Sequence, residues 1–302
     1  EKGGDRFRVL SYLTKAQSQC QNNGIVEMAW VDTALQAKLA LATGDLDYAE
    51  RLVAGTLRGI PPDSAPQLVD SIRAFGCWLK LYRNETEAIG QWLAQAPDET
   101  VEFCTLNRYL YMMKIYCYIA LGKHTEALVL LQRMLAYADY AQRTYFQMEC
   151  GVLSAIVLRR KGRPWKQAFL QLLGRIGEYH FVPILSEKGA AVLPLLTEVK
   201  SCFCAETPAQ RDWFAQVLEE TEHMARLYPN YLKGTGIDIS AFSDTALEVL
   251  RLQAAGRSTN EIAQQLHISP RTVKYHASEN YRKLQAKNMV DAVQIARSLN
   301  IL

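Results

Sequence analysis

The sequence predicts an all-α protein in which a long run of helix pairs precedes a small helical module. Apolar residues recur with the helical period almost throughout residues 1–228, and the alternation and turns of β-hairpins are nearly absent. A short motif occurs three times in this region, with a looser fourth copy, which indicates repeated helix pairs. Residues 256–284 have the pattern of two short helices joined by a tight turn.

The repeated motif begins at a residue suited to end one helix and places an alanine inside the next helix. Its copies are 44–49, 83–88, 122–127 and, more loosely, 162–168, and their alanines are 39, 39 and 41 residues apart. We expect the first residue of each copy, Gly44, Arg83 or Gly122, to adopt the left-handed conformation that closes a helix. The alanine then allows the two helices of a pair to pack closely.

Apolar helices are predicted before these motifs at 30–42, 68–82, 103–121 and 146–160, and a second helix follows each motif, as at 125–137. Neither helix of a pair can bury its apolar face alone, so stacked pairs form a superhelix with a continuous core. The pattern resembles the tetratricopeptide repeat, with the period lengthened from about 34 to about 40 residues. An irregular helical bundle is the alternative. Two further long helices are expected at 181–202 and 208–227.

The boundary between the two parts is predicted at Pro229, Gly234 and Gly236, which interrupt helix formation. The sequence therefore divides into a helical-repeat sensor or interaction domain at 1–228, a linker at 229–240 and a C-terminal domain at 241–302.

A repeat superhelix usually binds its ligands on the concave surface, which is lined by the first helix of each pair. Aligning the copies on their alanines places four candidate effector-binding residues on that surface: Arg73, Tyr109, Met112 and Tyr116. Packing between neighbouring helices is the alternative role for each of these side chains.

The positive charge of the chain is concentrated at its C-terminal end. The net charge is +3, and residues 240–302 contain eight Lys or Arg and five Asp or Glu, so the whole excess lies there. A polyanion is the partner that this distribution favours.

Seven cysteines without a C-x-x-C motif predict buried free thiols in a reducing compartment, with a redox pair at Cys202 and Cys204 as the alternative. We find neither a signal peptide nor a long apolar run, and we expect a cytoplasmic protein without a membrane partner.

Helix start and stop signals divide residues 241–302 into four short helices. The first helix starts at Ser243 and ends at Gly256, and the second starts at Ser258 with Glu261 and ends at Leu266. The third starts at Ser269 with Pro270, and the fourth starts at Asn288. His267 and Ile268 form the turn between the second and third helices, which gives the layout of a helix-turn-helix.

The third helix has one apolar face and one basic and polar face, as a recognition helix in the DNA major groove does. Lys274, Tyr275 and Ser278 lie in its first turns, where contacts to base edges are made. Phosphate contacts are predicted for Arg271, Thr272, Arg282, Lys283 and, from the preceding helix, Thr259. A merely solvated basic face is the alternative. No metal site is expected, because His276 has no second His or Cys at ligand spacing.

Residues 242–300 resemble the DNA-binding domain of LuxR-type regulators, a four-helix helix-turn-helix. The matching segments are 248–250, 261–263, 271–276 and 281–284, together with Gly256, Leu266, Ile268 and Ser269. The resemblance implies that Lys274, Tyr275 and Ser278 recognise bases. It also implies that the fourth helix mediates dimerisation on paired half-sites, through the face around Val290, Val293 and Arg297.

Three positions depart from the LuxR-type pattern. Ala246 replaces a usual acidic residue, Asn280 a usual apolar residue and Gln285 a usual glycine. Glu279 also introduces a negative charge beside the predicted groove contacts, which is expected to repel phosphate.

The preceding helical repeats resemble the sensor part of the large ATP-dependent LuxR-type regulators, the group that includes the maltose regulator. No G-x-x-x-x-G-K-[ST] motif occurs, so we expect no cofactor in this chain. The resemblance implies that the chain is a C-terminal portion with an ATP-binding module upstream, or a shortened relative.

Together these features predict a transcriptional regulator that binds double-stranded DNA as a homodimer and responds to a small-molecule or protein effector, with RNA polymerase as a further candidate partner. A helical-repeat scaffold tethered to DNA is the alternative. An enzyme is not expected, because no Ser/His/Asp arrangement, metal spacing or paired carboxylates emerge.

Overall fold

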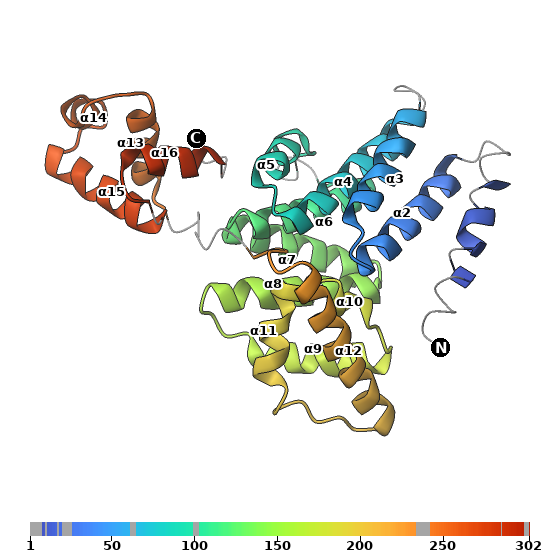
Figure 1. Cartoon of the computed structure of the whole chain (residues 1–302). Helices are drawn as coiled ribbons and strands as arrows, with labels where there is room; N and C mark the ends of the chain where they lie inside the picture. Colours follow the sequence, from blue (N-terminus) through green and yellow to red (C-terminus); the bar gives the residue numbers. More distant parts are fainter. Residues whose placement is uncertain are drawn as a thin grey trace.

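The structure is a computed structural model that describes residues 8–9, 11–16, 18–19, 26–60, 65–98, 103–233, 242–284, 286–298 and 302. These residues are helical and contain no strand, as the sequence predicts. They form a long first unit and a short C-terminal unit, each with its own hydrophobic core (Figure 1).

The first unit is a succession of helices in which each helix from α2 to α8 packs against the next one in the chain (Figure 1). The helices are α2 (Val26–Ala42), α3 (Leu46–Gly59), α4 (Pro66–Arg83), α5 (Thr86–Gln95), the 3-10 turn η1 (Thr105–Asn107), α6 (Arg108–Ala120), α7 (His124–Tyr140), α8 (Thr144–Arg160), α9 (Lys166–Glu178), α10 (Pro183–Ser186), α11 (Gly189–Val199) and α12 (Pro208–Leu227). Helix α4 also packs against α2 and α6, and α12 packs against α9, α10 and α11.

Four turns of the first unit use a residue in the left-handed conformation at the motifs found in the sequence. These residues are Gly44, Asn84, Gly122 and Gly162, with φ angles of 88°, 56°, 72° and 63°. The prediction for Arg83 is wrong by one position, because Arg83 is the last residue of α4 and Asn84 adopts the left-handed conformation. Asparagine adopts the left-handed conformation more readily than most residues other than glycine.

The motif alanines are only partly in the positions expected for close helix packing. Ala49 and Ala127 are fully buried, whereas Ala88 is half-buried and Ala168 is exposed. In the fourth copy the larger Trp165 and Phe169 fill the core in place of the alanine.

The helix predicted at 181–202 is divided into α10 and α11. Gly189 has a φ of 37°, and a Cβ atom at this position would lie 3.2 Å from the backbone of Met224 and Ala225 in α12. A glycine therefore allows both the break in the helix and the close approach of α12.

The linker predicted at 229–240 begins too early. The ring of Tyr231 stacks on that of Tyr82 with 4.0 Å between centroids, and Leu232 is fully buried. The Arg160 guanidinium donates a hydrogen bond to the Leu232 carbonyl. Residues 229–233 therefore belong to the first unit, and the rest of the predicted linker, 234–240, lies outside the described residues.

Cysteine placement agrees in part with the sequence analysis. Cys77, Cys117 and Cys150 are buried free thiols, whereas Cys202 and Cys204 are exposed and form no disulfide. Cys20 lies outside the described residues. Over the described ranges, no helix combines the length and the apolar character needed to cross a membrane.

The C-terminal unit consists of α13 (Asp244–Ala254), α14 (Thr259–Gln265), α15 (Pro270–Lys283) and α16 (Met289–Ser298). Two small apolar clusters hold it together. One joins α13 to α14 and α15 through residues that include Val249, Ile262 and Val273. The other joins α13 and α15 to α16 through residues that include Leu250 and Ala292. Helix α15 is common to both clusters, so its orientation is fixed along its whole length.

Candidate nucleic-acid interface

Local hydrogen bonds fix the start of α14 as the sequence predicts. The Ser258 hydroxyl accepts a hydrogen bond from the Glu261 amide at 3.4 Å, and the Glu261 carboxylate accepts one from the Ser258 amide at 2.7 Å. This reciprocal pair is the predicted capping box, which satisfies two backbone donors that a helix start otherwise leaves free.

The turn between α14 and α15 is equally well defined. His267 has a φ of 54°, and the Ile268 amide donates to the Ala263 carbonyl at 3.0 Å, so these residues end α14 in a tight turn. The Ser269 hydroxyl then accepts a hydrogen bond from the Thr272 amide at 3.1 Å and caps α15, with Pro270 in the first helical position.

Helix α15 presents one face to the core and the opposite face to solvent. Val273 and Ala277 are buried against α13 and α14. Five of the eight predicted DNA-contacting residues share the exposed face: Arg271, Lys274, Tyr275, Ser278 and Arg282. Tyr275 is 63% exposed, which is unusual for so large a ring and leaves it available for a partner.

The other three predicted contacts lie at the edge of this face and are half-buried. The Thr272 hydroxyl lies 2.8 Å from that of Ser269, within the cap of α15. The Lys283 ammonium lies 5.2 Å from the centre of the Phe242 ring. Thr259 is the first residue of α14, where a backbone amide is available to an anion. These three residues therefore border the exposed face of α15 and are less exposed than the five residues on it.

One ion pair lowers the positive charge of the exposed face. The Arg282 guanidinium donates to both carboxylate oxygens of Glu279, at 3.1 and 2.8 Å. The hydrogen bonds from Arg282 hold the pKa of Glu279 below its usual value, and the same bonds raise the pKa of Arg282. Glu279 therefore stays ionised at neutral pH. It forms an ion pair with Arg282, the arginine predicted to contact phosphate.

The two described departures from the LuxR-type pattern meet in the core. The Asn280 side chain is fully buried, and its amide donates to the Ala246 carbonyl of α13 at 2.7 Å. The third departure, Gln285, lies outside the described residues.

The residues predicted for dimerisation lie on α16, whose buried side is formed by Ala292 and Ala296. Val290 is 69% exposed, Arg297 is exposed and Val293 is half-buried. This surface is accessible within the C-terminal unit.

The four predicted effector-binding residues do not line one open surface. Met112 and Tyr116 are buried in the core, so the prediction that they face the inner surface is wrong. The Tyr116 hydroxyl donates to Glu149 at 2.7 Å, as part of a buried network. Tyr109 is half-buried, and burial raises its pKa. Arg73 is exposed and lies in a separate groove formed by α3, α4 and α5.

The residues that accompany Arg73 in this groove were not predicted from the sequence. The available signal was Gly76, a glycine in the middle of an apolar helix, which often marks a special packing or functional requirement. Within the described part of the chain, no group of three or more His, Cys, Asp or Glu side chains is arranged to hold a metal ion.

Comparison with known proteins agrees with the geometry of the C-terminal unit. Residues 240–296 match the family described as bacterial regulatory proteins, luxR family. The C-terminal unit is a LuxR-type helix-turn-helix domain. The matched family and relatives are DNA-binding transcriptional regulators, which are not enzymes.

Three curated relatives are similar to parts of this chain. The transcriptional regulatory protein DesR of Bacillus subtilis (strain 168) is 30% identical over 96 residues, which cover 32% of this chain and 47% of DesR. The putative HTH-type transcriptional regulator YhjB of Escherichia coli (strain K12) is 42% identical over 64 residues, 21% of this chain and 30% of YhjB. The uncharacterized transcriptional regulatory protein YvfU of Bacillus subtilis (strain 168) is 45% identical over 49 residues, 16% of this chain and 24% of YvfU.

The chain thus spans less than half the length of each of these curated relatives. No solved structure gives a significant match.

Proposed function

We propose that the protein is a transcriptional regulator that binds double-stranded DNA by placing α15 in the major groove. The observation that carries this proposal is the exposed face of α15, which is capped at its start and has no acidic residue in its first turn. A helix of 14 residues is about 21 Å long and narrow enough for the major groove.

The roles of the side chains follow from their positions on α15. Lys274, Tyr275 and Ser278 lie on the exposed face within the first nine of the 14 residues of α15, and the N-terminal residues of a recognition helix are the ones that contact base edges. Arg271 and Arg282 extend from the same face and are assigned to the flanking phosphates. The edge residues Thr259, Thr272 and Lys283 supply the remaining phosphate contacts.

Two copies of the chain bind the paired half-sites of an operator. The exposed side of α16, with Val290, Val293 and Arg297, is the surface assigned to dimerisation. An exposed valine and an exposed arginine about two turns apart on one helix face suit a small, two-fold symmetric contact, because the same patch must fit itself.

The helical first unit is assigned to sensing, as in the large ATP-dependent LuxR-type regulators that it resembles. Its consecutive helix pairs, which pack each on the next, support a tetratricopeptide-like superhelix. The unit binds a small molecule or a protein and thereby controls DNA binding in the cytoplasm. RNA polymerase is the further partner that a regulator of this kind contacts.

The test of DNA binding is a fluorescence-anisotropy titration with the DNA upstream of the gene and with an unrelated duplex, at several salt concentrations. We expect specific binding whose logarithmic affinity falls linearly with the logarithm of salt concentration. Failure of the folded protein to bind either duplex at low salt would refute the proposal.

Lys274→Ala tests base recognition in the same assay. We expect it to weaken specific binding by about 1–3 kcal/mol and to affect the unrelated duplex much less. Lys287→Ala is the matched control, because Lys287 is an exposed lysine outside α15. An equal loss on both duplexes would make Lys274 a phosphate contact.

A further inference from the structure

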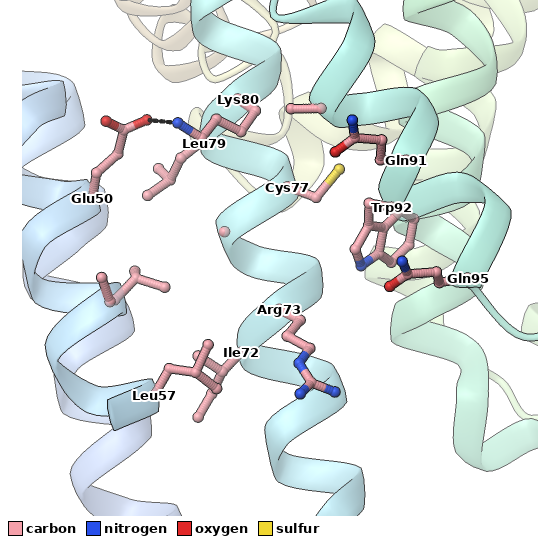
Figure 2. A pocket seen from close by; sticks show the side chains of 14 residues that line it. Glu50, Leu57, Ile72, Arg73, Cys77, Leu79, Lys80, Gln91, Trp92 and Gln95 are labelled. Atoms are coloured by element: carbon pink, nitrogen blue, oxygen red, sulfur yellow. Dashed lines mark ion pairs between the residues drawn. The ribbon is translucent and has the colours of Figure 1, made fainter. Parts of the chain in front are cut away.

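The groove that contains Arg73 is lined by residues of α3, α4 and α5, so it is not formed by the first helices of the pairs alone. Helix α4 forms its floor, and the second helices of two consecutive pairs, α3 and α5, form its walls (Figure 2). Its volume is about 470 Å³. This is within the range of pockets that hold small organic molecules, which is about 300–1,000 Å³.

The floor of the groove is apolar and contains a glycine that the protein's own packing does not require. Gly76 lies in the middle of α4 with ordinary helical backbone, and an added Cβ atom would meet nothing closer than Val53, at 3.8 Å. Glycine is among the least favourable residues inside a helix, and alanine would fit here. A larger side chain would fill the groove, so glycine keeps this space open.

The walls offer contacts for a flat, apolar molecule. Trp92 and Gln95 project from α5 toward the same region as Arg73 of α4, and Leu57 faces them from α3 (Figure 2). Trp92 is half-buried, so its ring has a face available for stacking. Amide and guanidinium groups at the rim fix the orientation of such a ligand, as in most small-molecule sites.

The charges at the rim favour an anion. Glu50 and Lys80 are 3.1 Å apart and neutralise each other, and Lys80 also pairs with Glu85. Arg73 pairs only loosely with Asp70, at 3.5 Å, and Asp70 does not line the groove. Both partners of this pair are more than half exposed, so it competes weakly with a ligand. A guanidinium suits the two oxygens of a carboxylate or a sulfonate.

We propose that the groove between α3, α4 and α5 binds a small organic anion, an aromatic molecule with one carboxylate or sulfonate group. The anionic group pairs with Arg73, and the aromatic body lies over Gly76 against Trp92. This inference deepens the sensing part of the proposed function and rests on it. Its test is carried out without DNA, so its failure leaves the test of DNA binding unaffected.

The probes are two dyes that differ in one anionic group. 1-Anilinonaphthalene-8-sulfonate is an aromatic anion, and N-phenyl-1-naphthylamine has the same ring system without the sulfonate. Binding to the full chain is followed by dye fluorescence. Gly76→Leu fills the floor of the groove, and Arg73→Gln removes the charge.

The matched controls lie outside the groove on α3. Gly55→Leu places the same side chain at an exposed helical glycine with nothing within 4 Å, and Arg51→Gln removes an exposed arginine. Ala54→Phe narrows the groove from an exposed wall position and replaces Gly76→Leu should that variant unfold.

We expect Gly76→Leu to weaken binding of both dyes about tenfold, because the leucine occupies their position. Arg73→Gln weakens binding of the sulfonate dye about threefold to tenfold and leaves the neutral dye unchanged. Both controls bind like the unaltered chain.

Three results would overturn the assignment. Unchanged dye binding by a folded Gly76→Leu or Ala54→Phe variant would show that the dye binds outside the groove. The dye would then be an adventitious additive only. Equal effects of Arg73→Gln on both dyes would remove the preference for an anion. A change in sedimentation of Gly76→Leu without a change in dye binding would show that a second copy of the chain covers the groove.

Discussion

Glu279→Gln is expected to strengthen DNA binding, because it releases Arg282 from its ion pair with Glu279. The Glu279 carboxylate accepts two hydrogen bonds from Arg282, at 3.1 and 2.8 Å, on the exposed face of α15. Glutamine keeps the size of the side chain and removes its negative charge. The change therefore frees Arg282 for phosphate and removes the repulsion between Glu279 and the DNA.

The size of the effect follows from charge and distance. Arg282 is 69% exposed and Glu279 is 31% exposed, so both interact with DNA through water. At a separation of about 8 Å in water, removing one repulsive charge pair is worth about 0.5 kcal/mol, or about 2.4-fold in affinity, and two subunits together give about sixfold. If each freed arginine neutralises one further phosphate, the salt slope steepens by about 0.9 per subunit.

The assay is the anisotropy titration, carried out from about 50 to 200 mM salt. Glu248→Gln is the matched control, since Glu248 pairs with Arg251 three residues away on α13, at 3.2 Å. It removes the same charge from the same unit but not from α15. Tighter binding with an unchanged salt slope would show that only repulsion is relieved. Unchanged or weaker binding would refute the placement of Arg282 beside phosphate.

Two further predictions concern stability and are measured by denaturant unfolding. Lys188 is buried 3.0 Å from the carboxylate of Glu149. Burial alone would raise the pKa of Glu149, but the charge of Lys188 and the hydrogen bonds from Tyr116 and Lys188 hold it below its usual value. Lys188→Met therefore costs about 3–5 kcal/mol at neutral pH. Without Lys188 the pKa of Glu149 rises, so Glu149 is protonated more readily toward about pH 5, and this protonation offsets part of the lost stability there. An equal loss of stability at about pH 5 and at about pH 8 would contradict this role of Glu149. Ser258→Ala removes the cap of α14 and costs about 1 kcal/mol, whereas Ser201→Ala, outside any helix cap, is expected to cost little; equal costs would show that the capping box contributes no net stability.

The C-terminal unit could be predicted in detail because its determinants are local in sequence. Ser243, Ser258 and Ser269 each accept a hydrogen bond from an amide three residues later, as their spacing predicts. The periodicity of α15 likewise predicted which side chains face solvent. Such features depend on a few neighbouring residues, and a sequence displays them directly.

The first unit was harder to predict because its key contacts join distant segments. Tyr231 is buried because its ring stacks on Tyr82, about half the chain away, and nothing near Tyr231 indicates this. The same is true of Lys188, whose partner Glu149 is on another helix. Helical periodicity identifies a buried face, but it does not tell whether that face meets a neighbouring helix or an open inner surface. Met112 and Tyr116 were misplaced for this reason.

The contact between Asn280 and Ala246 shows how two departures from a family pattern can form one feature. A usual apolar residue at position 280 would pack without a preferred direction, whereas the Asn280 amide is bound to a single carbonyl of α13 at 2.7 Å. A hydrogen bond in a buried site is satisfied in only one arrangement of the two helices. The small side chain of Ala246 leaves the close approach of α15 unobstructed. The hydrogen bond therefore adds a directional contact between α13 and α15 to the apolar packing that fixes α15, the helix that carries Lys274 and Tyr275.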